Sequence, residues 1–385
     1  MKFAHLGDCH LGSWRYPALQ ELNLQSFKRA IDLCIKEGVD FVLIAGDLFD
    51  SAYPPIDILK EAFSTLKKLK ESKISCFIIA GSHDYSVSGK TFLDVLEKAG
   101  FCKNVHLAEE KEDSIILNPV IHNKAAIYGY PGKKSGLEVQ ELKKIKLNES
   151  PGFFKILMLH TSIKDAVGRL PIEYVDETKL PKADYYALGH LHINYRNKNI
   201  VYSSPIFPNN FQEIEELKYG GFYIVETNPF NCWKVDLKLK EVELIELQID
   251  NTLIATEYII SEINKRNIRD KIILLRLSGE IKKGKTSNIN FIEIENYAKS
   301  KGAYVLLKST SGLLTKETKI EVETNDVDEL EKTIFKKYSE ENPSQFNSLI
   351  DSLINSLSLE KQEDEKSIIF NDRLMSEVNR ILNIQ

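Results

Sequence analysis

The stretch VLIAGDLFD, at residues 42–50, decides how this chain is interpreted. An apolar run is followed directly by Gly46 and Asp47. A short apolar run that ends on glycine is typical of a strand buried on both faces of a sheet. In open α/β sheets, ligands bind just beyond the carboxyl ends of such strands. The position of Asp47 therefore predicts a functional carboxylate at the edge of a sheet.

The same pattern recurs along the first half of the chain. The apolar segments 2–6, 74–80, 155–159 and 185–188 are predicted to be strands, and each is followed by polar residues. Together with Asp47, the polar residues at the strand ends are Asp8, His10, Ser82, His83, His160, His190 and His192. Residues i and i+2 of an extended backbone point the same way, so His190 and His192 can face one site. We expect all these side chains to gather at one rim.

This set of side chains predicts a metal site. Carboxylates and imidazoles without a thiolate suit Mn, Fe or Zn better than Ca or Mg. The number of ligands predicts two ions, and Asp47 is the natural bridge between them. Two metals about 3.5–4 Å apart can activate a water and stabilise both oxygens of a phosphoryl displacement. His5, His106 and His122 fit no motif and are expected to be structural.

Composition limits the class of protein. The 385 residues are 43% hydrophobic, which is enough for two or three domains. The net charge of −5 gives no overall attraction for nucleic acid, so DNA binding would depend on local basic patches and bound metal. The five cysteines form no paired motif and are expected to be reduced packing residues. With no signal peptide and no long apolar run, the chain is expected to be cytoplasmic, without membrane association.

Three domains are expected. Helices at 21–37, 56–71 and 91–99 alternate with the strands of the first domain, which is expected to be α/β over residues 1–228. A turn-like break near Asn228 predicts a boundary, followed by a small α+β domain of βαβαβ order at 229–325. Residues 326–385 are predicted to be helical, with an apolar stripe that packs on this chain or docks on a partner.

The motifs resemble those of the calcineurin-like metallophosphoesterases: GDCH at 7–10, GDLFD at 46–50, GSHD at 81–84, LHTS at 159–162 and GHLH at 189–192. The resemblance implies a β-sandwich flanked by helices. By the same resemblance, one metal is held by Asp8, His10, Asp47 and His192, and the other by Asp47, Ser82, His160 and His190. His83 would be the acid or the stabiliser of the transition state, and Asp84 would orient it.

Within that superfamily the chain is similar to the SbcD-type, or meiotic recombination eleven, nucleases of DNA double-strand-break repair. The similarity lies in HLGDCHLG at 5–12, in Arg15 and Tyr16, in GDLF followed by two prolines, and in YYALGHLH at 185–192. It implies a manganese-dependent 3′-to-5′ exonuclease and single-strand endonuclease, active as a homodimer on nucleoid DNA. It also implies a capping domain, DNA contacts from Arg15 and Tyr16, and C-terminal helices that bind a coiled-coil ABC-type ATPase.

Departures from the family pattern keep alternatives open, among them YSSPIFPNN at 202–210, which lacks the usual Gly-Ser pair. Ser82 stands where the family usually has Asn, and a hydroxyl is a shorter and poorer neutral ligand than an amide carbonyl. Asp50 stands where many relatives have His. Ser82 motivates a DNA-end tethering scaffold with weakened catalysis as one alternative. The other is a different binuclear-metal phosphoesterase, although GDLFDSAYPP at 46–55 lacks the arginine that protein phosphatases place there.

Overall fold

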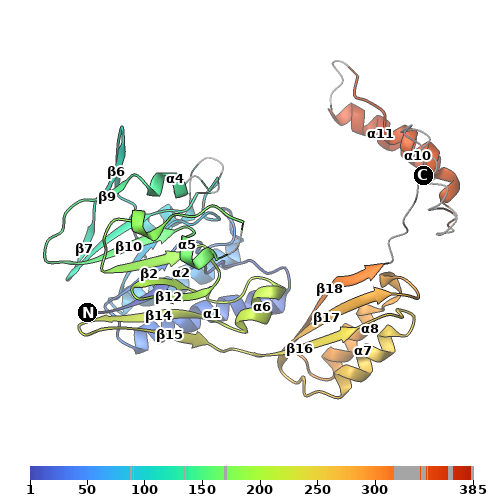
Figure 1. Ribbon diagram of the computed structural model, residues 1–385, viewed down its shortest axis with the longest axis horizontal. Helices are drawn as coiled ribbons and strands as arrows, with labels where there is room; N and C mark the ends of the chain where they lie inside the picture. The colour runs from blue at the N-terminus through green and yellow to red at the C-terminus, as the bar shows by residue number, and fades with distance from the viewer. Residues whose placement is uncertain are drawn as a thin grey trace. The chain divides into compact units, whose positions relative to one another are not determined.

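The computed structural model describes residues 1–86, 89, 91–133, 135–136, 138–168, 171–315, 339, 344, 346–362 and 367–382. The chain divides into two compact units, Met1–Thr315 and Lys316–Gln385. Each is described by itself (Figure 1).

The first part of the larger unit is a sandwich of two six-stranded sheets, so the predicted β-sandwich is confirmed. The first sheet has the order β15-β14-β1-β2-β3-β4 and the second the order β12-β13-β11-β10-β8-β7. Their bounds are β1 Lys2–Leu6, β2 Phe41–Ala45, β3 Ser75–Ile79, β4 Lys103–Asn104, β7 Val120–His122, β8 Ala125–Tyr130, β10 Phe154–His160, β11 Tyr185–Gly189, β12 Asn194–Asn197, β13 Ile200–Ser203, β14 Gly220–Thr227 and β15 Phe230–Leu237.

The inner strands of each sheet run parallel, as their continuous apolar sequences predict. Their carboxyl ends therefore lie at one edge of each sheet. An apolar layer fills the space between the sheets and includes the fully buried rings of Phe3, Phe41 and Tyr185. This packing fixes the two edges relative to each other, because burying large aromatic side chains contributes strongly to stability.

Helices cover the outer face of the first sheet: α1 Pro17–Lys36, α2 Ile56–Glu71 and α3 Phe92–Lys98. In α2, the buried residues Ile58, Ala62, Leu66 and Leu69 recur at steps of three and four, which places them on one face. Helix α1 begins earlier than predicted because Pro17 occupies its first turn, where a missing N–H costs nothing. The second sheet is covered by β5 Ala108–Lys111, β6 Ser114–Leu117, α4 Glu138–Leu142, β9 Ile145–Leu147, α5 Lys164–Val167 and η1 Glu177–Lys179.

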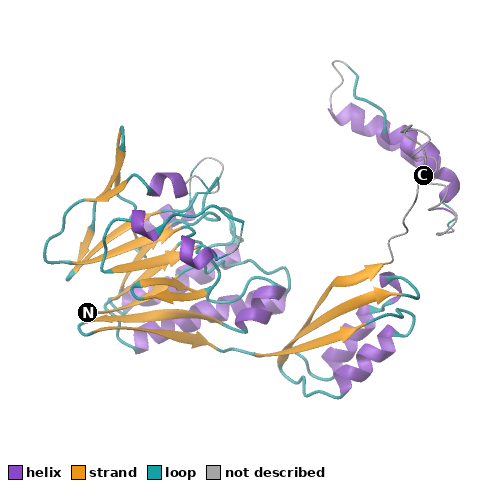
Figure 2. Ribbon diagram, viewed as in Figure 1, coloured by secondary structure: helices purple, strands orange, loops and turns teal. Residues whose placement is uncertain are grey.

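The small module of the same unit has the predicted βαβαβ order. It contains β16 Glu241–Gln248, α7 Ala255–Asn264, β17 Lys271–Ile281, η2 Thr286–Asn288, α8 Phe291–Ser300 and β18 Val305–Thr315. Its three strands are parallel, and both helices lie on one face of the sheet (Figure 2). The other face packs on the first domain, where Ile272 and Leu274 of β17 meet Leu22 of α1 and Ile214 of α6 Phe211–Leu217.

The turn at Asn228 and Pro229 was expected to separate two domains, and in this the structure differs from the sequence prediction. Strand β15 follows the turn and pairs antiparallel with β14 along its whole length. The turn is therefore a hairpin inside the first sheet, and the first domain extends through Leu237. The second expected boundary, between residues 325 and 326, lies outside the described residues.

The described part of the smaller unit is helical: η3 Asn347–Leu349, α10 Ile350–Leu357 and α11 Ser367–Leu382. Large apolar side chains such as those of Phe346 and Leu357 are exposed there. Throughout the described residues, no helix combines the length and apolar character that crossing a membrane requires.

Candidate metal centre

The strand ends place the predicted ligands at one rim, in strained backbone conformations. Asp8, His10, Asp47 and His190 have φ angles of 49°, 43°, 46° and 97°. Side chains other than glycine rarely adopt this left-handed region, and such residues concentrate at functional sites. The chain turns sharply after β1, β2 and β11, and each turn directs its polar side chains to the shared edge.

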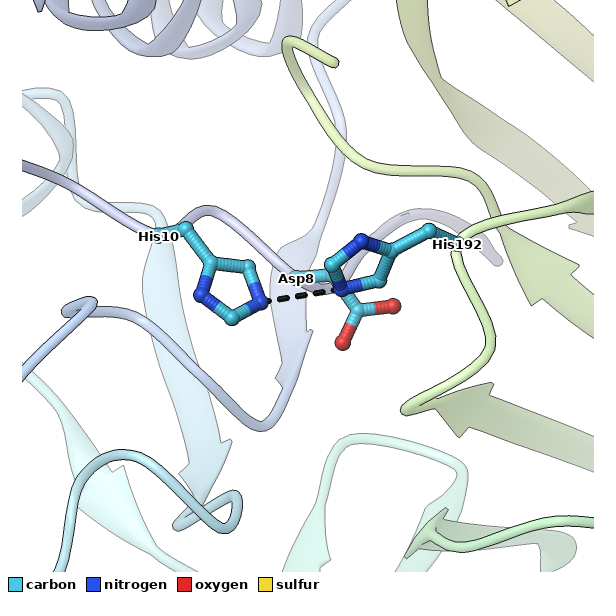
Figure 3. A group of neighbouring side chains, drawn as sticks. All are labelled: Asp8, His10 and His192. Atoms are coloured by element: carbon cyan, nitrogen blue, oxygen red, sulfur yellow. Dashed lines mark hydrogen bonds between the residues drawn. The ribbon is translucent and has the colours of Figure 1, made fainter. Parts of the chain in front are cut away.

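Asp8, His10 and His192 form a first cluster (Figure 3). The Nε2 atoms of His10 and His192 are 3.0 Å apart, and the Asp8 carboxylate lies beside them. Asp8 Oδ1 accepts a hydrogen bond from the backbone N–H of His190 at 2.8 Å. Asp8 Oδ2 is buried without a hydrogen-bond partner among the described residues. A buried carboxylate oxygen without a partner is costly unless a cation binds it.

Two further carboxylates determine how the rings of this cluster are oriented. His10 Nδ1 lies 3.1 Å from Asp50 Oδ1, and His192 Nδ1 lies 3.0 Å from Glu213 Oε1. An ionised carboxylate only accepts hydrogen bonds, so each Nδ1–H donates. The two Nε2 atoms lie 3.0 Å apart, where one ring donates a proton to the other. A divalent ion can take the place of that proton and bind both nitrogens, so the cluster fits a metal ion.

Asp8, Asp47 and His160 form a second cluster that adjoins the first. His160 Nδ1 donates to the carbonyl oxygen of Ala45 at 3.0 Å, which leaves Nε2 buried and without a hydrogen-bond partner. Asp47 Oδ2 lies 3.1 Å from His160 Nε2 and 3.6 Å from His10 Nε2. Asp47 therefore lies between the two clusters, a position that suits a bridging ligand.

The electrostatics of Asp47 favour its ionised form. Burial raises the pKa of this carboxyl, but the charge of the nearby His160, followed by that of His10, outweighs burial and holds the pKa below its ordinary value. The other carboxylate oxygen, Oδ1, accepts from the backbone N–H of His83 at 2.8 Å. Asp47 thus has one oxygen fixed by the backbone and one directed at the two imidazoles.

His190 and Ser82, the other expected ligands of the second metal, lie at the same rim. The ring centroids of His190 and His160 are 5.1 Å apart. Burial, followed by the charge of His160, lowers the pKa of His190 to about 4, so its ring is neutral. Ser82 is half-buried at the end of β3, and its hydroxyl makes no hydrogen bond within the described part of the chain.

The structure separates the two residues that were expected to act as a pair, His83 and Asp84. The His83 side chain is 49% exposed, and its Nδ1 lies 2.8 Å from the carbonyl oxygen of Asp50. Asp84 was expected to orient His83, but its buried carboxylate accepts backbone hydrogen bonds from Leu48, Phe49 and Gly81. Burial, and then the charge of Asp47, raise the pKa of Asp84 to about 7. Asp84 therefore joins two loops, and the carbonyl of Asp50 orients His83.

Glycines allow the strands to approach this closely. Gly46 has a φ of +88°, and a Cβ built there would lie 2.2 Å from His160 Nδ1. A Cβ at Gly189 would lie 2.0 Å from the carbonyl oxygen of Ala45, which is the acceptor for His160. The glycines of the GD and GH motifs are therefore required by sterics at the site.

Sequence reasoning missed the role of Glu213. Its carboxylate is held by the backbone N–H of Asn209 at 2.8 Å and by the Asn210 side chain at 2.6 Å. Asn210 caps α6, and the Asn210–Glu213 spacing is a capping pattern that predicts a helix start but no metal-site contact. Arg15 and Tyr16 lie on an exposed loop that leads into α1.

Comparison with known proteins agrees with this geometry. Residues 1–194, half of the chain, match the family described as Calcineurin-like phosphoesterase. The chain belongs to this family. It is therefore a metal-dependent phosphoesterase, and its Asp and His clusters are groups that could bind the divalent ions the family uses. The predicted family resemblance is confirmed.

Curated relatives extend the match beyond the first domain. "DNA double-strand break repair protein Mre11" of Archaeoglobus fulgidus is 27% identical over 304 residues, which cover 72% of this chain and 68% of that protein. The Mre11 protein of Methanocaldococcus jannaschii is 28% identical and covers 64% of this chain and 67% of its own length. "Uncharacterized metallophosphoesterase YhaO" of Bacillus subtilis is 30% identical and covers 58% of this chain and 57% of its own length.

Proposed function

We propose that this chain is a manganese-dependent DNA nuclease that processes double-strand breaks, as a 3′-to-5′ exonuclease and a single-strand endonuclease. The observation that carries the proposal is the position of Asp47 Oδ2 between His10 Nε2 and His160 Nε2, at a rim where two metal-binding clusters adjoin. The similarity to proteins named for double-strand-break repair supports DNA as the substrate.

The ligand set suits two divalent ions. Asp8, His10, Asp47 and His192 hold one, and Asp47, Ser82, His160 and His190 hold the other. When bound, such ions supply an activated water and positive charge at the phosphoryl oxygens. Oxygen and imidazole ligands without thiolates are consistent with manganese.

His83 acts on the substrate from the rim. The half-exposed ring donates from Nδ1 to the carbonyl of Asp50, which leaves Nε2 free of that contact to accept or deliver a proton at the leaving oxygen. Arg15 and Tyr16, on the exposed loop that follows β1, contact the DNA backbone and stack on bases.

The remaining parts serve assembly. The module that begins with β16 is the capping domain. The apolar side chains of α10 and α11 bind a coiled-coil ABC-type ATPase, in the mode in which amphipathic helices dock in a groove. The chain acts as a homodimer in the cytoplasm, on nucleoid DNA.

The test is cleavage of a labelled single-stranded oligonucleotide and a blunt duplex by the purified full chain with MnCl2. Asp47→Asn keeps the shape of the side chain and an acceptor for the His83 N–H, and it should abolish cleavage. Asp57→Asn, an exposed residue in the first turn of α2, is the matched control and should cleave like the unaltered protein. Cleavage retained by Asp47→Asn would disprove the site assignment.

The half-buried hydroxyl of Ser82 favours a second candidate, a DNA-end tethering scaffold with weakened catalysis. That protein would bind duplex ends without cleaving them, and Ser82→Asn would restore cleavage. A different binuclear-metal phosphodiesterase would hydrolyse a small nucleotide diester but not the oligonucleotide, so the same assays with that substrate separate the three functions.

A further inference from the structure

Two of the three candidate metal clusters, the first and second described above, differ in what holds their imidazole ligands. In the first cluster, both rings donate from Nδ1 to carboxylates, His10 to Asp50 at 3.1 Å and His192 to Glu213 at 3.0 Å. A carboxylate on the far nitrogen fixes the ring and makes the ligating nitrogen more basic.

The imidazole ligands of the second cluster are held by weaker hydrogen-bond contacts. His160 donates to the neutral carbonyl of Ala45 at 3.0 Å. The ring of His190 makes no hydrogen bond to any described residue, so its orientation depends on packing alone. The fourth expected ligand is the hydroxyl of Ser82, a neutral group with a short reach. The carboxylates of the second cluster are those of Asp8, which also belongs to the first cluster, and Asp47, which lies between His10 and His160.

We infer that the two metal ions bind with unequal affinity and in a fixed order, the first at Asp8, His10 and His192 because Asp50 and Glu213 orient and polarise its imidazole ligands. Asp50 and Glu213 are positioning residues, since they act through His10 and His192. This inference rests on the binuclear site of the proposed function but not on DNA as the substrate.

Glu213 is the stronger of the two positioning residues. Its second oxygen is fixed by the backbone N–H of Asn209 at 2.8 Å, and its side chain is 16% exposed. The Asp50 side chain is 36% exposed, so water competes for its contact with His10. Removal of such a partner typically weakens metal binding by about 10–100-fold. We expect Glu213→Gln to fall in this range and Asp50→Asn to fall at its lower end.

The experiment is calorimetric titration of MnCl2 into the metal-stripped full chain, without DNA. The unaltered protein should show two binding events whose dissociation constants differ by at least about tenfold. Glu213→Gln and Asp50→Asn should weaken the tighter event and leave the weaker one within about twofold. Ser82→Asn should strengthen the weaker event alone.

Glu216→Gln is the matched control, because it makes the same charge change at an exposed position of α6, where Glu216 accepts from Gln212 of the same helix. It should change neither event. Thermal unfolding of each metal-free variant shows whether it folds. If Glu213→Gln on α6 does not fold, Asp50→Asn tests the inference without a change in α6.

Two equal binding events would overturn the inference, and so would a loss confined to the weaker event in Glu213→Gln. The outcome is independent of cleavage. Unequal binding with no DNA cleavage would support the inference and refute the nuclease proposal. Equal binding with efficient DNA cleavage would refute the inference and support the nuclease proposal.

Discussion

The pKa of His5 should show how strongly the interior of the sandwich excludes water. It lies on β1 with 0% exposure, and its Nδ1 is 2.9 Å from the hydroxyl of Tyr185 on β11. Burial lowers the pKa of His5 from 6.5 to about 3. The unfolded chain binds a proton at this residue below pH 6.5, whereas the folded chain does not until about pH 3. The contribution to stability is therefore constant above pH 6.5 and falls as the pH decreases towards 3.

The size of the effect follows from the pKa difference. Each pH unit below 6.5 removes about 1.4 kcal/mol of unfolding free energy, so about 2 kcal/mol is lost at pH 5. His5→Gln keeps a hydrogen-bonding group next to Tyr185 but does not titrate. Between pH 8 and pH 5, we expect the unaltered protein to lose about 2 kcal/mol more than His5→Gln.

The assay is urea unfolding at both pH values in the presence of EDTA, with tryptophan fluorescence as the readout. Both tryptophans, Trp14 and Trp233, pack against the first domain, so the signal reports this domain. Other groups titrate equally in both proteins, so their contributions cancel in the difference. Equal losses in the two proteins would show that His5 takes up a proton in the folded state and would refute the argument from burial.

Three further predictions test local features. Gly46→Ala should lower the free energy of unfolding in urea by about 2–5 kcal/mol, because the cost of a positive φ adds to the cost of the clash between the new Cβ and His160. A loss under about 1 kcal/mol would contradict this. Asp84→Asn should cost about 1–3 kcal/mol in the same assay, because an amide that replaces the carboxylate cannot accept all three backbone hydrogen bonds; an unchanged stability would argue against that role. Arg15→Ala should reduce the slope of log K against log [salt] for oligonucleotide binding by about the amount that one phosphate contact contributes. An unchanged slope would show that Arg15 does not contact the DNA.

The rim of the sandwich could be predicted from sequence because its signals are local. An apolar run that stops at Gly46 and Asp47 contains both the strand and the reason for the turn after it. The same holds for His190 and His192, whose spacing of two places them on one side of an extended chain. Parallel pairing of β1, β2 and β3 then brings the strand ends together without further information.

The features that sequence reasoning missed depend on how distant segments pack. Glu213 contacts His192 only because α6 lies against the rim, and the capping pattern around Asn210 predicts a helix start without its location. Asp50 orients His10 across 40 positions of sequence. The turn at Asn228 was misread because the same residue types make a hairpin and a domain link.

Helix α6 has a consequence for how this protein can be divided. Glu213 on α6 contacts the ring of His192, an expected metal ligand. Ile214 and Glu215 face the small module, Ile214 in an apolar cluster with Leu274 and Glu215 in an ion pair with Arg276. A shortened chain that stops after Leu237 would retain every expected metal ligand and yet expose Ile214 to water. The packing of α6, and with it the position of Glu213, would differ in such a fragment. Inhibitor screens and rate measurements therefore need the chain through Thr315.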